Sequence, residues 1–237
     1  MLKIREDVDL NVLEKYGFVN DEIYGRKVKV KKMKTKILEF NVNWNSIKRA
    51  CMRTIGKEGG NKEPSSEWKR KILICRHSPI RKGVITWKWE EIPYAISTHF
   101  ARHHEGCEKF ISTSRADRTE IKDRHERSQM DNVSMEMDAN IDGLISIAGR
   151  RLCTQADKTT REYMEDLVDA ISEYDEDIAW ALVPQCVARG GCCEPFGKCT
   201  YYDNFSKTLT KEEQTNITKR YDKYNEYRQK VKSRKNN

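Results

Sequence analysis

The distribution of apolar residues along the chain predicts both strands and helices. In GVITWKW, residues 83–89, apolar and polar side chains alternate, which is typical of a β-strand with one buried face. Elsewhere apolar residues recur at every third or fourth position, the period of an amphipathic helix. We expect helices within residues 43–56, 93–104, 137–152 and 159–172.

Other stretches are less regular. Residues 8–18 predict a short helix ended by a glycine, and residues 67–75 fit either a helix or a buried strand. The lysine-rich run 26–36 predicts a solvated edge strand, with a phosphate-binding patch as the alternative. Residues 57–67, rich in Gly, Pro and Ser, predict a loop.

Composition indicates one folded domain with an appendage. Of the 237 residues, 37% are hydrophobic and 35% charged, so most of the chain should fold. We expect a single domain over residues 1–205 and a basic amphipathic helix or tail over residues 206–237.

No run approaches the roughly 20 apolar residues that cross a bilayer, and the first ten residues lack the apolar core of a signal peptide. A cytoplasmic location without membrane attachment is therefore expected.

The positive charge is concentrated in the last segment. The chain carries a net charge of +8, and residues 206–237 hold ten Lys and Arg against four Asp and Glu. This segment also begins with a helix capping box, Thr210 with Glu213, and has a stripe of tyrosines. A nucleic-acid-binding accessory protein is therefore an alternative hypothesis, although the rest of the chain is close to neutral.

Eight cysteines occur in a chain without a secretory signal, which favours thiols or metal ligands over disulfides. Four of them lie in CVARGGCCEPFGKC, where the spacing is wider than in zinc fingers. Buried thiols that pack loops are the favoured interpretation. The alternative is a structural zinc held by Cys186, Cys192 and Cys199, which Cys153 would complete if the fold brings it near.

Four arginine-rich segments indicate an anion pocket. They are CRHSPI, FARHH, STSRADR and AGRRLCTQADKTTR. Arginine's planar fork of donors matches phosphates and carbonyl groups, and neighbouring His103 and His104 are poorly placed to chelate one metal ion. His99 and His103 have helical spacing for a metal, but no carboxylate follows one turn away. A thiol nucleophile, Cys107 beside His104, is a weaker alternative.

The order of these motifs resembles the flavin-dependent thymidylate synthases (ThyX family). HSPI, the strand GVITWKW, a helix that starts at a proline, ARHH and STSR follow one another as in that family's signature. AGRRLCTQADKTTR resembles a later helix of the family, with Asn140 upstream of it. The resemblance covers roughly residues 45–175, and it rests on order and spacing more than on any one match.

Several positions depart from the family pattern. Arg81 stands where the family has a glutamate, and His104 stands where it has an arginine. The segment around Glu108 is altered, and the span from Arg115 to Arg151 is shorter than in the common form. These differences indicate a divergent branch, whose substrate or reaction can differ from that of the family's common form.

The resemblance implies an α/β fold, with helices packed on a mixed or antiparallel sheet and a C-terminal helical tail. It also implies a homotetramer with FAD at subunit interfaces. In such enzymes NADPH reduces the flavin, and a one-carbon unit passes from methylenetetrahydrofolate to C5 of dUMP without a protein nucleophile. A pyrimidine-nucleotide hydroxymethylase on the same fold is an alternative within this class.

The resemblance also assigns residues. The residues expected to contact FAD are Ser78, Arg102, His103, His104 and Asn140. His77 would lie near flavin and folate, and the residues expected to bind dUMP are His99, Ser114, Arg115, Arg151 and Arg127 or Arg124. His77 and Arg151 are the expected catalytic residues, with Arg151 neutralising charge that develops on the uracil.

Overall fold

A computed structural model describes residues 18–21, 26–29, 35–113 and 128–235. Contacts divide the chain into two units, Met1–Lys34 and Thr35–Asn237. The first unit contains strands β1 (Phe18–Asp21) and β2 (Arg26–Lys29), which pair antiparallel. Part of the lysine-rich run 26–36 therefore forms a strand, while the helix predicted over residues 8–18 lies outside the described residues except for Phe18.

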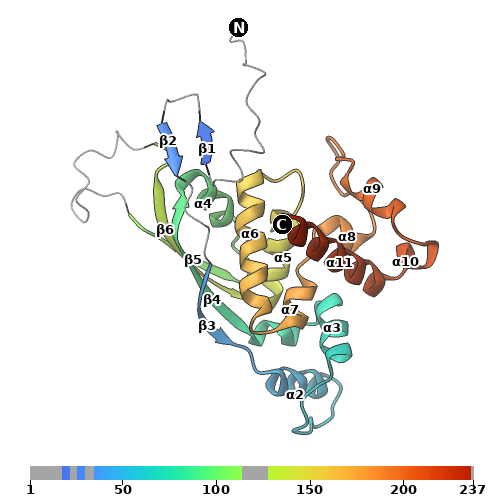
Figure 1. The fold of residues 1–237 in the computed structure, drawn as a ribbon. Coiled ribbons are helices and arrows are strands. Elements are labelled where there is room, and N and C mark those ends of the chain that lie inside the picture. Colours follow the sequence, from blue (N-terminus) through green and yellow to red (C-terminus); the bar gives the residue numbers. More distant parts are fainter. Residues whose placement is uncertain (1–17, 22–25, 30–34, 114–127, 236–237) are drawn as a thin grey trace. The chain divides into compact units, whose positions relative to one another are not determined.

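The second unit contains a four-stranded antiparallel sheet in the order β3-β4-β6-β5 (Figure 1). Its strands are β3 (Lys36–Asn41), β4 (Val84–Pro93), β6 (Asn132–Asn140) and β5 (Cys107–Ile111). In β4 the residues Ile85, Trp87 and Trp89 are buried, and in β6 alternate residues are buried in the same way. The strand predicted from GVITWKW is confirmed, and the alternation gives the sheet one apolar face.

Helices α4 (Tyr94–Ala101), α5 (Ile141–Arg151) and α6 (Lys158–Ser172) contact the sheet and cover this apolar face (Figure 1). Trp89 lies between the rings of Phe100 and Tyr163, at centroid distances of 4.7 and 5.6 Å. The helix predicted from residue 137 begins instead at Ile141. The sequence pattern was wrong there because the alternating apolar residues before Asn140 belong to strand β6.

Three elements connect β3 to β4. They are α2 (Trp44–Thr54), α3 (Ser66–Ile74) and the short 3₁₀ helix η1 (Ser78–Lys82). The ambiguous stretch 67–75 is therefore helical, and the Ser65 hydroxyl accepts from the Trp68 amide to cap α3. Such a cap satisfies an amide that the helix itself leaves unpaired.

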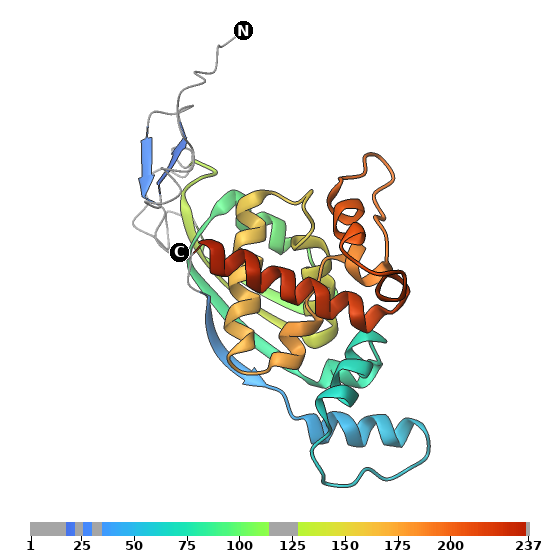
Figure 2. The ribbon, with the colours of Figure 1, turned by 45° about the vertical axis from the view of Figure 1, so that its right-hand side comes forward.

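The C-terminal segment forms five helices among the described residues. They are α7 (Glu176–Ala181), α8 (Gln185–Arg189), α9 (Tyr201–Lys207), α10 (Lys211–Thr215) and α11 (Ile217–Lys235). The predicted capping box is present at the start of α10. Helix α11 crosses α6 (Figure 2), where the Arg228 guanidinium pairs with Asp169. Tyr221 and Tyr224 on α11 are buried.

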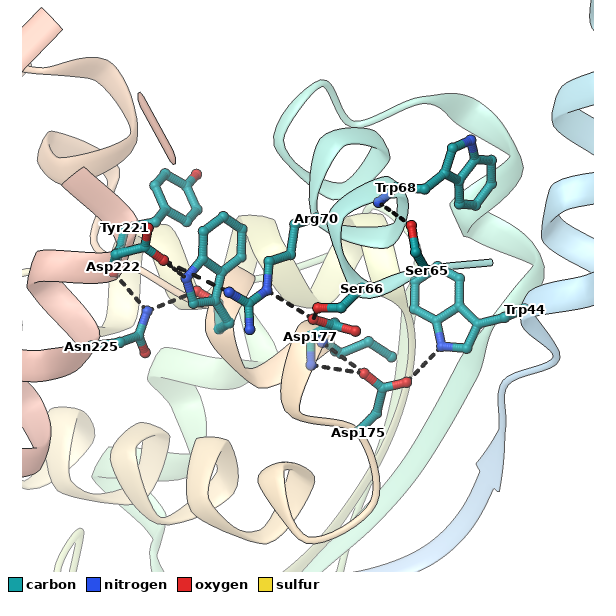
Figure 3. A network of polar contacts seen from close by, with 12 residues as sticks. Trp44, Ser65, Ser66, Trp68, Arg70, Asp175, Asp177, Tyr221, Asp222 and Asn225 are labelled. Carbon is teal, nitrogen blue, oxygen red and sulfur yellow. Dashed lines mark hydrogen bonds and ion pairs between the residues drawn. The ribbon is translucent and has the colours of Figure 1, made fainter. Parts of the chain in front are cut away.

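A polar network joins α11 to α3 and α7 (Figure 3). The Arg70 guanidinium donates to Asp177 over 2.8 Å, lies 3.7 Å from Asp222, and stacks on the Trp180 ring. The Trp180 indole donates to Asp222 over 2.8 Å. Residues 206–237, expected to be an appendage, thus lie in the same compact unit as the sheet. None of the helices in the described ranges is long and apolar enough to span a membrane.

Candidate functional site

A cavity of about 600 Å³ opens on the face of α5 that points away from the sheet. Its walls come from the end of α3, the segment after α4, α8 and α11. Its lining consists of Ile74, Arg76, Arg102, His103, His104, Glu105, Ile145, Ser146, Gly149, Arg150, Val183, Gln185, Ala188, Arg189, Ile217 and Tyr221. Segments more than a hundred residues apart in the sequence therefore build one pocket.

The pocket is strongly cationic. Four arginines and two histidines line it, against a single carboxylate, Glu105. The guanidinium of Arg76 is bound to Asp142 over 2.6 Å, and Arg189 is bound to the Gln185 side-chain amide. In contrast, Arg102 and Arg150 have no hydrogen-bond or ion-pair partner within the described part of the chain. Two exposed guanidinium groups are thus available to an anion.

Local turns bring the predicted histidines to α5. Helix α4 ends at Ala101, and Gly106 then turns the chain into β5 with φ of +69°. A side chain at Gly106 would meet the Asn140 amide, at 2.7 Å from its nitrogen. Only glycine therefore suits both the backbone conformation and the close approach. The turn leaves His103 and His104 against the outer face of α5.

Arg151 is held by the end of α4. Its Nε donates to His103 Nε2 over 3.0 Å, and its Nη2 donates to the His99 carbonyl. Burial, and next the positive charge of Arg151, lower the pKa of His103 to about 4. His103 is therefore neutral near pH 7 and can accept this hydrogen bond. Burial and the charges of Arg102 and Arg150 also lower the pKa of Arg151.

His99 extends the same cluster. Its Nδ1 lies 2.7 Å from the Thr160 hydroxyl, and burial, followed by the charge of Arg151, lowers its pKa. The structure thus brings together five residues that the sequence assigned to FAD or dUMP. They are His99, Arg102, His103, His104 and Arg151.

His77 and Ser78 lie apart from the lining of this pocket, at η1. His77 Nδ1 is buried and has no hydrogen-bond partner within the described residues, which leaves it free for a ligand or water. Ser78 is exposed. Arg81, which stands where the family has an acid, pairs with Asp142 over 3.1 Å, and Arg76 binds the same carboxylate.

Asn140 has a structural role that does not involve a ligand. Its Oδ1 accepts from the Gly143 amide over 2.9 Å and so caps α5. Ser114, Arg115, Arg124 and Arg127, expected to bind dUMP, lie outside the described residues.

Three pocket arginines were missed by the sequence interpretation. Arg76 and Arg150 lie in the arginine-rich segments and could have been found there, whereas Arg189 lies in the cysteine-rich stretch and gave no signal. Arg76 has φ of +51°, at a position after α3 where glycine is usual. Hydrogen bonds from its guanidinium to Asp142 and Ser146 hold the side chain at the pocket wall, although the backbone conformation is unfavourable for a residue other than glycine.

The structure also bears on the two interpretations of the cysteines, as a nucleophile at Cys107 and as buried thiols or metal ligands in CVARGGCCEPFGKC. The Cys107 thiol is buried, donates to the His103 carbonyl over 3.2 Å, and has a pKa raised by burial, so a nucleophile at Cys107 is disfavoured. Of the cysteines in CVARGGCCEPFGKC only Cys186 is buried, so the prediction of buried, loop-packing thiols is wrong for the others. No three His, Cys, Asp or Glu side chains in the described ranges are arranged to hold a metal ion.

Comparisons with known proteins show the fold. No protein-family model matches the sequence, and no curated protein sequence matches it. Among solved structures, the UMP/dUMP methylase PolB from Streptomyces cacaoi, bound with 5-Br dUMP, superposes with a TM-score of 0.52 and 10% identity. The similarity covers 64% of this chain and 94% of PolB.

The flavin-dependent thymidylate synthase ThyX from Helicobacter pylori, complexed with FAD and dUMP, also has a TM-score of 0.52 and 10% identity. Here the similarity covers 64% of this chain and all (100%) of the other. The chain therefore has the α/β fold of these methylases, and the predicted fold class is confirmed.

Proposed function

We propose that this chain is a flavin-dependent methylase of a uracil nucleotide, with dUMP as the first candidate substrate. The observation that carries the proposal is the cationic pocket on α5, in which Arg102 and Arg150 lack partners within the described residues beside the neutral His103. The fold shared with PolB and ThyX supports the same reaction class. UMP is the alternative nucleotide, because PolB is described as a UMP/dUMP methylase.

The residues present suit FAD. A cavity of about 600 Å³ falls within the range of about 300–1,000 Å³ usual for ligand pockets, and its lining combines cations with the apolar side chains of Ile74, Ile145 and Val183. Arg102 and Arg150 would bind the pyrophosphate, and His103 and His104 would contact the flavin part. The partnerless, buried His77 Nδ1 would be satisfied by a ligand close to η1.

When bound, FAD would supply the redox chemistry that amino-acid side chains lack. The contribution of the protein is binding, orientation and charge. Arg151 is fixed by His103 and by the His99 carbonyl, so its guanidinium needs little reorganisation to stabilise negative charge on a pyrimidine. Neutral His103 keeps Arg151 in place by accepting its Nε–H.

The remaining assignments belong to the same proposal. NADPH would be the reductant and methylenetetrahydrofolate the one-carbon donor. A homotetramer would complete the site, and Ser114, Arg115 and Arg127 would bind the nucleotide. His77 and Ser78 would lie close to the cofactor, and Asn140 would serve chiefly as a helix cap.

The first experiment is a visible absorption spectrum of the purified protein with and without added FAD, followed by titration with dUMP and with UMP. We expect a bound-flavin spectrum that changes when the preferred nucleotide is added. A matched pair of variants tests the pocket: Arg150→Gln should weaken FAD binding, whereas Arg53→Gln, an exposed arginine on α2, should not. A protein that takes up no FAD and responds to neither nucleotide would refute the proposal.

Product analysis by mass then separates the two reactions. A product heavier than the substrate by CH₂, with a methyl group in place of hydrogen at C5, supports the methylase. A product heavier by CH₂O, with a hydroxymethyl group at C5, supports the alternative enzyme. The nucleic-acid hypothesis loses support from α11, because Lys219, Lys223 and Arg228 pair with carboxylates. Binding to DNA that weakens with salt and disappears without residues 206–237 would revive it.

A further inference from the structure

Helix α5 carries two glycines, Gly143 and Gly149, and packing explains only the first. A Cβ atom at Gly143 would lie 2.7 Å from the Gly106 carbonyl oxygen and 2.9 Å from the Glu105 carbonyl oxygen. Both distances are too short for a contact between non-bonded carbon and oxygen atoms. The turn that leads into β5 therefore packs directly on α5, and glycine leaves the room for it.

Gly149 is not required by the packing of α5 against α8 (Figure 1). A Cβ atom at this position would have its nearest neighbours in Gln185 of α8, with the Gln185 Cβ at 3.6 Å and its backbone nitrogen at 3.8 Å. These distances are ordinary van der Waals contacts. Gly149 also lies within the helix and does not have a positive φ, so its backbone conformation suits alanine.

Glycine at position 149 lowers the stability of the fold. In a helix it is less favourable than alanine, because its backbone loses more conformational freedom on folding. Alanine would therefore be the more stable choice at a position where its methyl group fits. Residues that lower stability without a packing reason are typical of functional sites.

The surroundings of Gly149 indicate that function. Gly149 lies on the wall of the cationic pocket and is partly exposed there. Its neighbours on the lining are Ile145, Ser146 and Arg150 of α5 and the small side chain of Ala188 of α8. The missing Cβ thus lets a ligand approach the α5 backbone closely, next to the exposed guanidinium of Arg150.

We propose that Gly149 keeps this wall open for the planar ring of a nucleotide ligand, whose phosphates bind to Arg150 and Arg102. The inference rests on the proposed function, because FAD and dUMP both join such a ring to phosphate. A planar ring makes its contacts over a whole face, so it needs a wall without a projecting side chain. The methyl group of an alanine would occupy part of this space. Gly149 is therefore a specificity-determining residue of the pocket.

Thermal melting of the full-length protein without ligand tests the packing argument. Gly149→Ala should raise the melting temperature by about 1–4 °C, because it restricts the unfolded chain at a position that accepts alanine. Gly143→Ala should lower it, since its methyl group would meet the Gly106 and Glu105 carbonyls. Gly60→Ala is the matched control outside the pocket, where an added Cβ would have no neighbour within 4 Å.

Titrations with FAD and, separately, with dUMP test the binding argument. Gly149→Ala should weaken binding of the compound whose ring lies at this wall by about tenfold or more, because one extra methyl group is forced into a close contact. Gly60→Ala should bind both compounds like the wild type. Addition of that compound should also reverse the order of the melting temperatures, because a ligand stabilises the folded chain according to its affinity. A purely structural role of Gly149 would not produce this reversal.

Three outcomes count against the inference, and they can be told apart. Wild-type protein that binds FAD or dUMP, with unchanged affinities in Gly149→Ala, would overturn it and leave the proposed function standing. A lower melting temperature of ligand-free Gly149→Ala would overturn it as well, because glycine would then have a packing reason. Wild-type protein that binds neither compound would refute the proposed function, and the role of Gly149 with it.

Discussion

Protonation of His103 should destabilise the protein in acid. The ring accepts a hydrogen bond from Arg151, and Arg150, Lys109 and His104 add further positive charge around it. A proton on Nε2 would remove the acceptor and place a cation beside Arg151. The same change would release the guanidinium that we propose to act on the pyrimidine.

The direction follows from the two pKa values. The folded-state pKa of His103 is about 4, below the ordinary value of 6.5, with burial as the largest cause. Between these values the unfolded chain binds more protons than the folded one. The stabilisation is therefore complete above pH 6.5 and is lost as the pH falls towards 4.

The size of the effect can be bounded. One pKa unit corresponds to about 1.4 kcal/mol, so a fully buried group with this shift would contribute about 3 kcal/mol. His103 is only partly buried, and solvent screening reduces the expected contribution to about 1–2 kcal/mol. For a chain of this length that is a change in melting temperature of about 3–6 °C.

The assay is urea unfolding at pH 7.5 and pH 4.5 for the wild type and for His103→Gln. Glutamine does not titrate, and its carbonyl can still accept from Arg151. The wild type should lose about 1 kcal/mol more than the variant on acidification, since the other titrating groups are common to both. Equal losses, or an NMR titration that places the pKa of His103 near its ordinary value, would refute the reasoning.

Three further predictions concern binding and stability. Arg102→Gln should weaken flavin or nucleotide binding about tenfold or more and leave the stability unchanged, because this side chain has no partner within the described residues. Isothermal titration measures the affinity and thermal melting measures the stability. An unchanged affinity would count against a binding role of Arg102. Asn140→Ala should lower the free energy of unfolding, measured with denaturant, by about 1 kcal/mol. Asn140→Asp should lower it less, since aspartate can also cap α5. Equal losses in the two variants would contradict the capping role. Deleting residues 206–237 should destabilise the fold by about 5 kcal/mol or more, because it removes the buried side chains of Leu209, Tyr221 and Tyr224. A truncated chain that melts at the same temperature as the full chain would contradict this contribution.

Local sequence patterns were enough to predict several secondary-structure elements correctly. The alternation in residues 83–89, the helical period of residues 159–172 and the capping box at Thr210 and Glu213 each act over one or two turns, so they depend little on the rest of the chain. The family resemblance assigned Arg102, His103 and Arg151 to one site. In the structure Arg151 donates to His103 and lies within range of the Arg102 charge, while their part in ligand binding stays a prediction.

Tertiary contacts decided the rest. Whether residues 137–140 continue a helix or end a strand depends on pairing with β4, which a single segment cannot reveal. Arg81 pairs with Asp142, 61 residues away in the sequence, because the fold packs η1 against α5.

The pocket itself exists only in the folded chain. Arg76 follows α3, whereas Arg150 lies in α5 and Arg189 in α8. Their convergence at one pocket results from packing and is not visible in any sequence periodicity. The same holds for Thr154 and Cys199, which are 45 residues apart in the sequence and joined by a hydrogen bond. The sequence by itself determined which chemical groups and which local elements this protein has, because these depend on neighbouring residues. Only the tertiary structure decided which of those groups meet, because that depends on contacts between distant segments.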